Sequence, residues 1–247
     1  MGVRLPILGS GEFYDVRPSK IVAVGLNYRD HVAESPSILA AKARGGAATG
    51  VPDAAEAPTA PVLFPKTPNV LLGPGEPVVI PTTWLKAGGL AAPRTDYEAE
   101  LAVVLGKRLR RASPKEALEA VLGYSCFNDI SQRDLQNGDR SGWWRGKSLD
   151  GFGPIGPVLA PAALVGDPQA LAIECRLNGR VVQRSSTAAM IFTVAEVLSY
   201  ISWSVTLEPG DIVATGTPSG VGPLKAGDLV EVEIEKIGVL STPVAED

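Results

Sequence analysis

Two glutamates separated by one residue stand at the start of an apolar run, in the segment DYEAELAVVLG at residues 96–106. Because side chains two positions apart in a strand lie on the same face, the carboxylates of Glu98 and Glu100 are expected side by side. Two carboxylates at the mouth of a buried strand repel each other, and each loses hydration. A hard divalent cation such as Mg²⁺ or Mn²⁺ relieves both costs, since these ions take oxygen ligands. The alternative is a solvated strand end, where two glutamates so spaced are common.

A third carboxylate, Asp129, ends another apolar run, YSCFND, just before a short helix predicted over residues 131–136. Aspartate is a favoured residue at a helix N-terminus, so capping is its alternative role. As a third metal ligand it would leave about three octahedral positions, enough for the two oxygens of a 2-oxo acid and one water. The pattern alone does not place Asp129 near the glutamates.

The single histidine of the chain, His31, is followed by Glu34 at helical spacing. Residues three apart lie on one helical face, where a carboxylate can orient the imidazole ring and raise its basicity. This is the arrangement that a general base needs. A capping or surface histidine is the alternative.

Further polar residues could bind an anion. Arg133 and Gln136 are three residues apart on the short helix and could hold a substrate carboxylate, while Lys147 could stabilise a developing enolate or oxyanion. The glycine-rich turn TGTPSGVG at residues 215–222 offers backbone N–H groups and hydroxyls, without the lysine of a P-loop. An ordinary surface helix and a plain tight turn are the alternatives.

The framework that must position these side chains is rich in strands. Asn178-Gly179 is a strong hairpin signal, and capping boxes at residues 113–116 and 193–196 open two short helices. Strands are predicted at residues 21–25, 100–106, 123–127, 171–177, 180–184, 212–215, 229–237 and 240–244. Without regular strand–helix alternation, these elements predict an α+β fold on antiparallel or mixed sheets.

The remaining segments are less regular. Residues 1–19 are expected to form a short surface strand and turn before a single domain at residues 20–247. A helix is predicted from residue 27 to about residue 44. Residues 45–60 are predicted to be an irregular loop or insertion because they are rich in Gly, Ala and Pro. A second irregular stretch is predicted at residues 81–94.

Composition excludes several classes of function. The 247 residues are 45% hydrophobic and carry 23 Lys+Arg against 27 Asp+Glu, so no basic footprint for nucleic acid is present. No apolar run is long enough for a transmembrane helix, and the N-terminus is too weakly apolar for a signal peptide. Cys126 and Cys175 lack metal-binding spacing and are predicted to be reduced core thiols. A cytoplasmic protein is therefore expected, with no nucleic-acid or membrane partner.

Taken together, six segments in this order resemble the fumarylacetoacetate hydrolase (FAH) family, over nearly the whole chain. The segments are VGLNYRDHVAE, DYEAELAVVLGK, YSCFNDISQRDLQ, RGKSLDGFGPIGP, LNGRVVQ and GDIVATGTPSGVG. The resemblance implies a mixed β-sandwich or β-roll of the FAH C-terminal-domain type, with short helices, a lid at about residues 27–60, and a homodimer.

The resemblance also implies a role for each candidate residue. Glu98, Glu100 and Asp129 would bind Mg²⁺ or Mn²⁺. His31 and Glu34 would form a catalytic dyad on the lid, and Lys147 would lie near the metal. The residues that would contact the substrate are Arg133, Gln136 and Thr217. Residues 45–60 and 83–93 form longer stretches than compact family members carry. Trp143 and Trp144 either form a wall of the pocket or pack in the protein interior.

The implied chemistry acts on a small 2-oxo acid through a metal-bound enolate. The first hypothesis is hydrolysis of a C–C bond in acylpyruvate-type substrates, or decarboxylation of an oxaloacetate-type acid. The second is an isomerase or hydratase of aromatic catabolism, acting on 2-hydroxy-dienoic diacids. The third is a non-catalytic ligand-binding relative, which the complete set of candidate residues disfavours.

Overall fold

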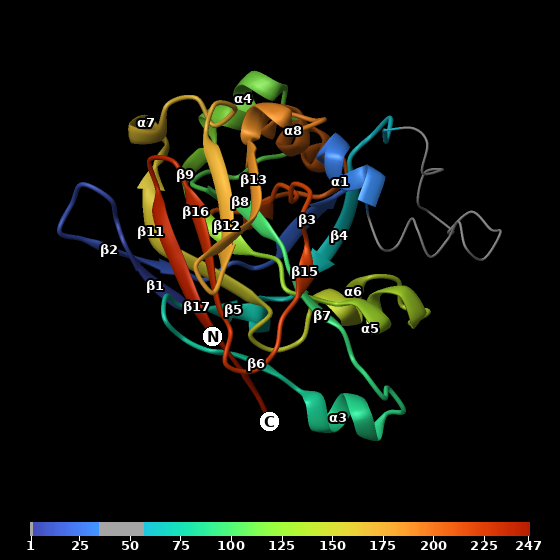
Figure 1. The fold of residues 1–247 in the computed structure, drawn as a ribbon. Coiled ribbons are helices and arrows are strands. Elements are labelled where there is room, and N and C mark those ends of the chain that lie inside the picture. Colours follow the sequence, from blue (N-terminus) through green and yellow to red (C-terminus); the bar gives the residue numbers. More distant parts are fainter. Residues whose placement is uncertain (1, 35–56) are drawn as a thin grey trace.

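A mixed seven-stranded sheet is the largest sheet in the computed structural model, which describes residues 2–34 and 57–247 (Figure 1). Its strands in spatial order are β4 (Val62–Lys66), β3 (Ile21–Gly25), β14 (Ile212–Ala214), β8 (Ala99–Leu105), β9 (Val121–Asn128), β11 (Gly153–Pro161) and β5 (Leu71–Leu72). The β14–β3 and β11–β5 pairs are parallel, and the other neighbours are antiparallel.

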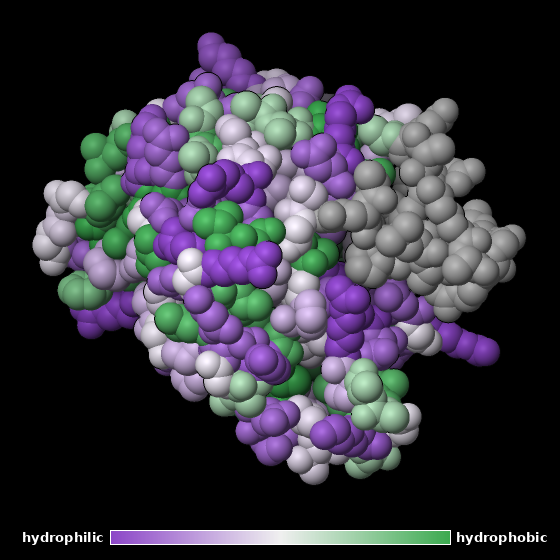
Figure 2. All heavy atoms as spheres, viewed as in Figure 1, coloured by the Kyte–Doolittle hydropathy of each residue, from purple (hydrophilic) through white to green (hydrophobic). Residues whose placement is uncertain are grey.

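A five-stranded sheet packs against the first. Its order is β13 (Arg180–Ser186), β12 (Ala172–Leu177), β16 (Leu229–Ile234), β17 (Gly238–Glu246) and β6 (Val78–Ile80), with the β17–β6 pair parallel. Its outer face is polar, and Arg176 there forms ion pairs with Glu174, Glu231 and Glu233. Figure 2 shows hydrophilic residues interspersed with hydrophobic ones over this side of the molecule.

Strand β8 is central because both of its faces are buried. Leu101 and Val103 belong to the core between the two sheets, whereas Ala102 and Val104 pack in a second core on the opposite face. Glu100 shares the face of Ala102, as side chains two apart must. The apolar character of the whole run thus reflects a strand covered on both sides.

Two smaller sheets complete the β-structure. Strands β1 (Val3–Pro6) and β2 (Phe13–Val16) form a hairpin, and β10 (Ser131–Gln132), β7 (Thr95–Tyr97) and β15 (Gly222–Pro223) form a three-stranded sheet. The expected surface strand is therefore a hairpin, and its Leu5 and Val16 are fully buried in the second core.

The helices are short. They are α1 (Arg29–Glu34), α3 (Thr82–Ala87), α4 (Pro114–Glu119), α5 (Arg133–Gly138), α6 (Trp144–Lys147), α7 (Ala162–Val165) and α8 (Val194–Ser204), with 3₁₀ turns at Pro68–Val70 and Thr187–Ala189. Both predicted capping boxes are present, at Ser113 and Thr193. No helix in the described ranges is long and apolar enough to pass through a bilayer.

Most predicted elements agree with the structure, and the α+β class is confirmed. The hairpin turn is confirmed by positive φ angles of 53° at Asn178 and 77° at Gly179. The helix predicted from residue 131 begins instead at Arg133, because Ser131 and Gln132 pair with β7. The stretch predicted to be irregular from residue 81 contains α3. Of the helix predicted over residues 27–44, Arg29–Glu34 is observed, and residues 35–56 lie outside the described chain.

Candidate active site

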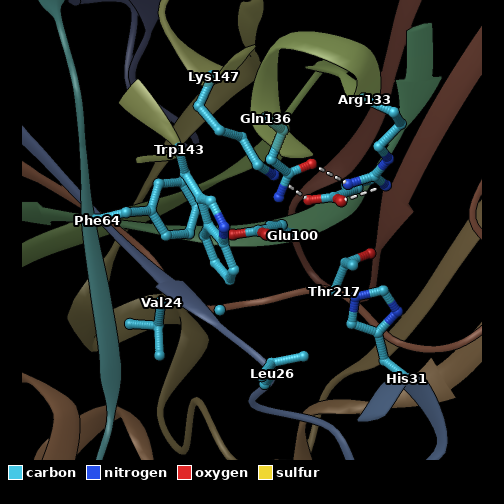
Figure 3. A pocket seen from close by; sticks show the side chains of 12 residues that line it. Val24, Leu26, His31, Phe64, Glu100, Arg133, Gln136, Trp143, Lys147 and Thr217 are labelled. Atoms are coloured by element: carbon cyan, nitrogen blue, oxygen red, sulfur yellow. Dashed lines mark hydrogen bonds and ion pairs between the residues drawn. The ribbon is translucent and has the colours of Figure 1, made fainter. Parts of the chain in front are cut away.

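A pocket opens where β3, β4 and β8 approach α1, α5 and α6. Its lining consists of Val24, Gly25, Leu26, His31, Phe64, Glu98, Glu100, Arg133, Gln136, Trp143, Lys147 and Thr217. Figure 3 shows Phe64 and Trp143 on one side, His31 and Thr217 on the other, and Glu100 between them. The pocket therefore combines an apolar wall with a polar interior.

The three predicted metal ligands lie close together, with Glu98 and Glu100 in the pocket lining. One carboxylate oxygen from each of Glu98, Glu100 and Asp129 lies within 4.8 Å of the other two, and all three residues are buried. Strand pairing brings them together, since β8 and β9 pair antiparallel with Ala99 opposite Asn128. The backbone N–H of Asp129 then donates to the carbonyl of Glu98 at 2.8 Å.

Two buried lysines partly balance these carboxylates. Lys147 Nζ lies 2.6 Å from Glu98 Oε2 and 2.7 Å from Asp129 Oδ2, and Lys66 Nζ lies 2.6 Å from Asp129 Oδ1. Burial lowers the pKa of a lysine, but the charges of Asp129 and Glu98 outweigh it and raise the pKa of Lys147. Lys147 is therefore a cation within the site.

Glu98 and Glu100 differ in their electrostatic surroundings. Burial alone would raise the pKa of Glu98, but the charges of Lys147 and Arg133 hold this pKa below its ordinary value. Burial, with the charges of Asp129 and Glu98, raises the pKa of Glu100 well above its ordinary value. Glu100 forms no ion pair with the described residues, and its Oε2 accepts a hydrogen bond from the backbone N–H of Gly216 at 2.9 Å.

The donor set fits a hard divalent cation. Three buried carboxylates supply oxygen ligands, which Mg²⁺ and Mn²⁺ prefer. Glu100 is the carboxylate that lacks a cationic partner among the described side chains, so a dication would neutralise charge where the protein's lysines do not. Sequence spacing predicted the pairing of Glu98 with Glu100, and strand register adds Asp129.

Arg133 is held in a network of buried hydrogen bonds. Its guanidinium donates to Asp96 at 2.9 Å, to Glu98 at 2.6 Å and to Gln136 Oε1 at 2.7 Å. Arginine has donors and no acceptor. The side-chain carbonyl of Gln136 must therefore face Arg133, which leaves the Gln136 amide N–H groups for a ligand in the pocket.

His31 lines the pocket. Burial lowers the pKa of His31 to about 4, so the imidazole is neutral at neutral pH. Its Nδ1 atom is buried without a hydrogen-bond partner in the described part of the chain. Glu34 ends α1, but its side chain is not among those described. The predicted His31–Glu34 dyad therefore stays a prediction, as does the lid beyond residue 34.

Trp143 both packs and walls the pocket. Its ring meets that of Phe64 at 5.2 Å in an edge-to-face arrangement. A side chain on Gly25 would come within 2.6 Å of the Trp143 ring, so this approach requires glycine. Trp144, by contrast, is 46% exposed and does not line the pocket.

A profile of the family described as "Fumarylacetoacetate (FAA) hydrolase C-terminal" matches residues 20–245. The chain belongs to this family. One similar protein is oxaloacetate tautomerase fahd2, mitochondrial, of Xenopus laevis, with which the chain shares 38% sequence identity. The match covers 92% of this chain and 66% of that protein. The FAH-type fold that the sequence predicted is confirmed by two solved structures.

The first solved structure is fumarylpyruvate hydrolase from Pseudomonas aeruginosa, in complex with Mn²⁺ and pyruvate. It is 31% identical with a TM-score of 0.79, over 100% of this chain and 96% of that chain. The second is 2-hydroxyhepta-2,4-diene-1,7-dioate isomerase from Mycobacterium marinum. It is 32% identical with a TM-score of 0.76, over 96% of this chain and 82% of that chain. The chain is thus similar to FAH-family proteins named for three different reactions.

Three polar residues of this FAH-family site were not predicted from the sequence. Lys66 ends β4, Asp96 lies in β7, and Gln183 lies in β13. All three are buried and hydrogen-bonded to candidate site residues. A signal was available for Lys66, since a lysine that ends a strand of aromatic and aliphatic residues needs a buried partner. Asp96 and Gln183 carry no comparable local signal.

Proposed function

We propose that this chain is a divalent-metal-dependent enzyme that acts on a small 2-oxo acid. The favoured reaction is hydrolysis of a C–C bond in an acylpyruvate-type substrate, or decarboxylation of an oxaloacetate-type acid. The observation that carries the proposal is a cluster of three buried carboxylates at a pocket that is also lined by side chains able to donate hydrogen bonds. A carboxylate next to a keto group presents only acceptors, which complements those donors.

The metal would be Mg²⁺ or Mn²⁺, held by Glu98, Glu100 and Asp129. When bound, such an ion supplies a Lewis acid that stabilises negative charge on the oxygens of the ligand. The Mn²⁺ and pyruvate named for the similar fumarylpyruvate hydrolase support this assignment. Mg²⁺ and Mn²⁺ share the same preference for oxygen ligands.

The protein groups that would bind the acid are donors. Arg133 orients Gln136 so that its amide N–H groups are free for the ligand carboxylate. Lys147, a cation beside Glu98 and Asp129, would stabilise negative charge that develops on the keto oxygen. These contacts favour the charged form of the substrate that arises during reaction over its neutral form.

His31 would move the proton. As an imidazole that lines the pocket, it would accept a proton from water, and the resulting hydroxide would attack the distal carbonyl of an acylpyruvate. The C–C bond then breaks, its electron pair forms the enolate of pyruvate, and the distal acyl group leaves as a carboxylic acid. The enolate takes up a proton to give pyruvate. Glu34 would orient the imidazole.

An isomerase reaction is the second candidate. Proton transfer between carbon and oxygen needs the same base and the same charge stabilisation, but no attacking water. The isomerase and tautomerase names of two similar proteins favour it. A two-ended diacid would also need a second cation, and of the described residues that line the pocket, only Arg133 and Lys147 are cationic.

The test incubates the purified protein with an acylpyruvate and with oxaloacetate, with Mg²⁺, with Mn²⁺, or with a chelator. Loss of the enol absorbance together with release of pyruvate supports the hydrolase or decarboxylase. Loss of the enol absorbance without pyruvate supports the isomerase. Metal without protein controls for spontaneous reaction. A chelator-resistant rate would contradict metal dependence, and His31→Ala with unchanged turnover would contradict the assigned base.

A further inference from the structure

Gln183 connects β13 to the pocket through three hydrogen bonds. Its Oε1 atom accepts from the backbone N–H of Ala99 at 3.0 Å, between the two glutamates of the candidate metal site. Its Nε2 atom donates to the carbonyl of Pro218 at 2.8 Å and to Thr217 Oγ1 at 2.9 Å. The side chain is buried, and all of its hydrogen-bonding atoms are engaged.

These partners fix the orientation of the Gln183 amide. A backbone N–H can only donate and a carbonyl can only accept, so Oε1 must face Ala99 and Nε2 must face Pro218. The second hydrogen on Nε2 is then directed at Thr217, whose hydroxyl oxygen serves as the acceptor. The Thr217 proton remains to be donated elsewhere, and no acceptor for it is found among the described residues.

We propose that Gln183 is a positioning residue that makes the Thr217 hydroxyl a hydrogen-bond donor toward the ligand. Thr217 lines the pocket, and a 2-oxo acid offers only acceptor oxygens there. If the hydroxyl donated to residue 183 instead, its oxygen lone pairs would face the acid. The inference rests on the proposed binding of a 2-oxo acid with a divalent metal.

The turn that carries Thr217 is docked closely on β13. A Cβ atom on Gly220 would lie 2.1 Å from the carbonyl oxygen of Val182, and φ at Gly220 is +94°. The same turn supplies the N–H of Gly216 that donates to Glu100. Gln183 therefore fixes the direction in which the Thr217 hydroxyl donates, and the turn that carries this hydroxyl also contacts the candidate metal ligand Glu100.

Gln183→Glu tests the inference because it keeps the shape of the side chain and replaces the Nε2 donor with an oxygen. An ionised carboxylate at position 183 would present only acceptors, and a protonated carboxyl group there would give its single proton to the Pro218 carbonyl. In both forms the Thr217 hydroxyl turns to donate to residue 183. The measurement is calorimetric titration of pyruvate into the Mn²⁺-loaded protein.

We expect Gln183→Glu to weaken pyruvate binding by about tenfold, the worth of one hydrogen bond to a charged group. Thr217→Val should weaken it by a similar factor. The double variant should bind no more weakly than either single variant, because both remove the same bond. Thr217→Ser, which keeps the hydroxyl, should bind pyruvate more tightly than Thr217→Val.

The matched control is Gln169→Glu. Gln169 Nε2 also donates to a carbonyl, that of Thr187, and its Oε1 accepts from the N–H of Val194, but the residue does not line the pocket. This variant should lose stability without a change in pyruvate affinity. If Gln183→Glu fails to fold, Thr217→Val and Thr217→Ser in the same titration still decide whether the Thr217 hydroxyl donates to the ligand.

The outcomes separate the inference from the proposed function. A wild type that binds Mn²⁺ but not pyruvate overturns the proposed function, and the inference with it. Pyruvate binding that survives Gln183→Glu unchanged, or that Thr217→Val does not weaken, overturns the inference alone. Additive losses in the double variant also overturn it, since they would show that Gln183 acts on affinity without Thr217.

Discussion

The ammonium group of Lys66 lies 2.6 Å from a carboxylate oxygen of Asp129, and both side chains are completely buried. The other oxygen of Asp129 faces Lys147 at 2.7 Å. Lys66 also donates to the backbone carbonyl of Lys147. A single lysine outside the pocket lining thus orients one candidate metal ligand and the backbone of the lysine beside it.

Lys66→Met should destabilise the protein by about 3 kcal/mol, because removal of one partner leaves a buried charge less compensated. Urea unfolding of the metal-free protein measures this change. Lys66→Met combined with Asp129→Asn should be less destabilised than Lys66→Met alone, since the unbalanced carboxylate is gone. A single variant within about 0.5 kcal/mol of the wild type would contradict the structural role of the pair.

Glu100→Gln should weaken Mn²⁺ binding by at least about tenfold. Substitution of residues that only hydrogen-bond to a metal ligand already lowers metal affinity by that factor. Calorimetric titration of Mn²⁺ measures the effect, with the exposed Glu12→Gln as the control. A Mn²⁺ affinity equal to that of the wild type would remove Glu100 from the ligand set.

The same substitution has a consequence for the metal-free protein at different pH. Because the pKa of Glu100 is raised in the folded chain, its contribution to stability is present below the unfolded pKa and is lost as the pH rises. Metal-free wild type should therefore lose stability relative to Glu100→Gln as the pH rises above about 4.5. Unfolding curves of both proteins that stay parallel across this range would contradict the prediction.

His31 should act on stability with the opposite sign. Its pKa is about 4 in the folded chain against an ordinary value of 6.5, so between these values the unfolded chain binds the proton more tightly. Stability should fall as the pH drops through this window. His31→Gln should remove up to about 3 kcal/mol of that fall, measured by urea unfolding at several pH values. An equal fall in both proteins would show that His31 is not buried as described.

Gly25→Ala and Trp143→Ala should change substrate selectivity in the same direction. An added methyl on residue 25 would push the Trp143 ring from its place, and truncation of Trp143 removes the ring. Both should raise kcat/KM for bulky acylpyruvates relative to small ones by about tenfold. Trp144→Ala is the control, because that ring is exposed. An unchanged ratio in both variants would show that Trp143 does not limit the pocket.

Local patterns predicted the parts of the site that lie close together in the sequence. The spacing of Glu98 and Glu100 was enough to expect neighbouring carboxylates, and the structure places them together, although Glu98 lies in the break between β7 and β8. Both capping boxes and the Asn178-Gly179 turn were equally predictable, because each depends on a few consecutive residues.

Contacts between distant segments could not be predicted in the same way. Asp129 joins the glutamates through the register of β8 with β9, and Lys66 arrives by the pairing of β4 with β3. Strand β11 escaped prediction because its sequence GPIGPVLAP is interrupted by glycine and proline, which are depleted in strands. These features depend on the assembled sheets and not on local propensity.

Asp96 is fully buried between two arginines, Arg133 in the pocket and Arg94, whose side chain is 46% exposed. Arg94 ends the stretch that follows α3, and its backbone N–H donates to Asp134 on α5. The outer loop is thereby coupled through Asp96 to an arginine that lines the pocket. A substitution at Arg94 would therefore act on the pocket through Asp96 while every pocket-lining residue stays the same.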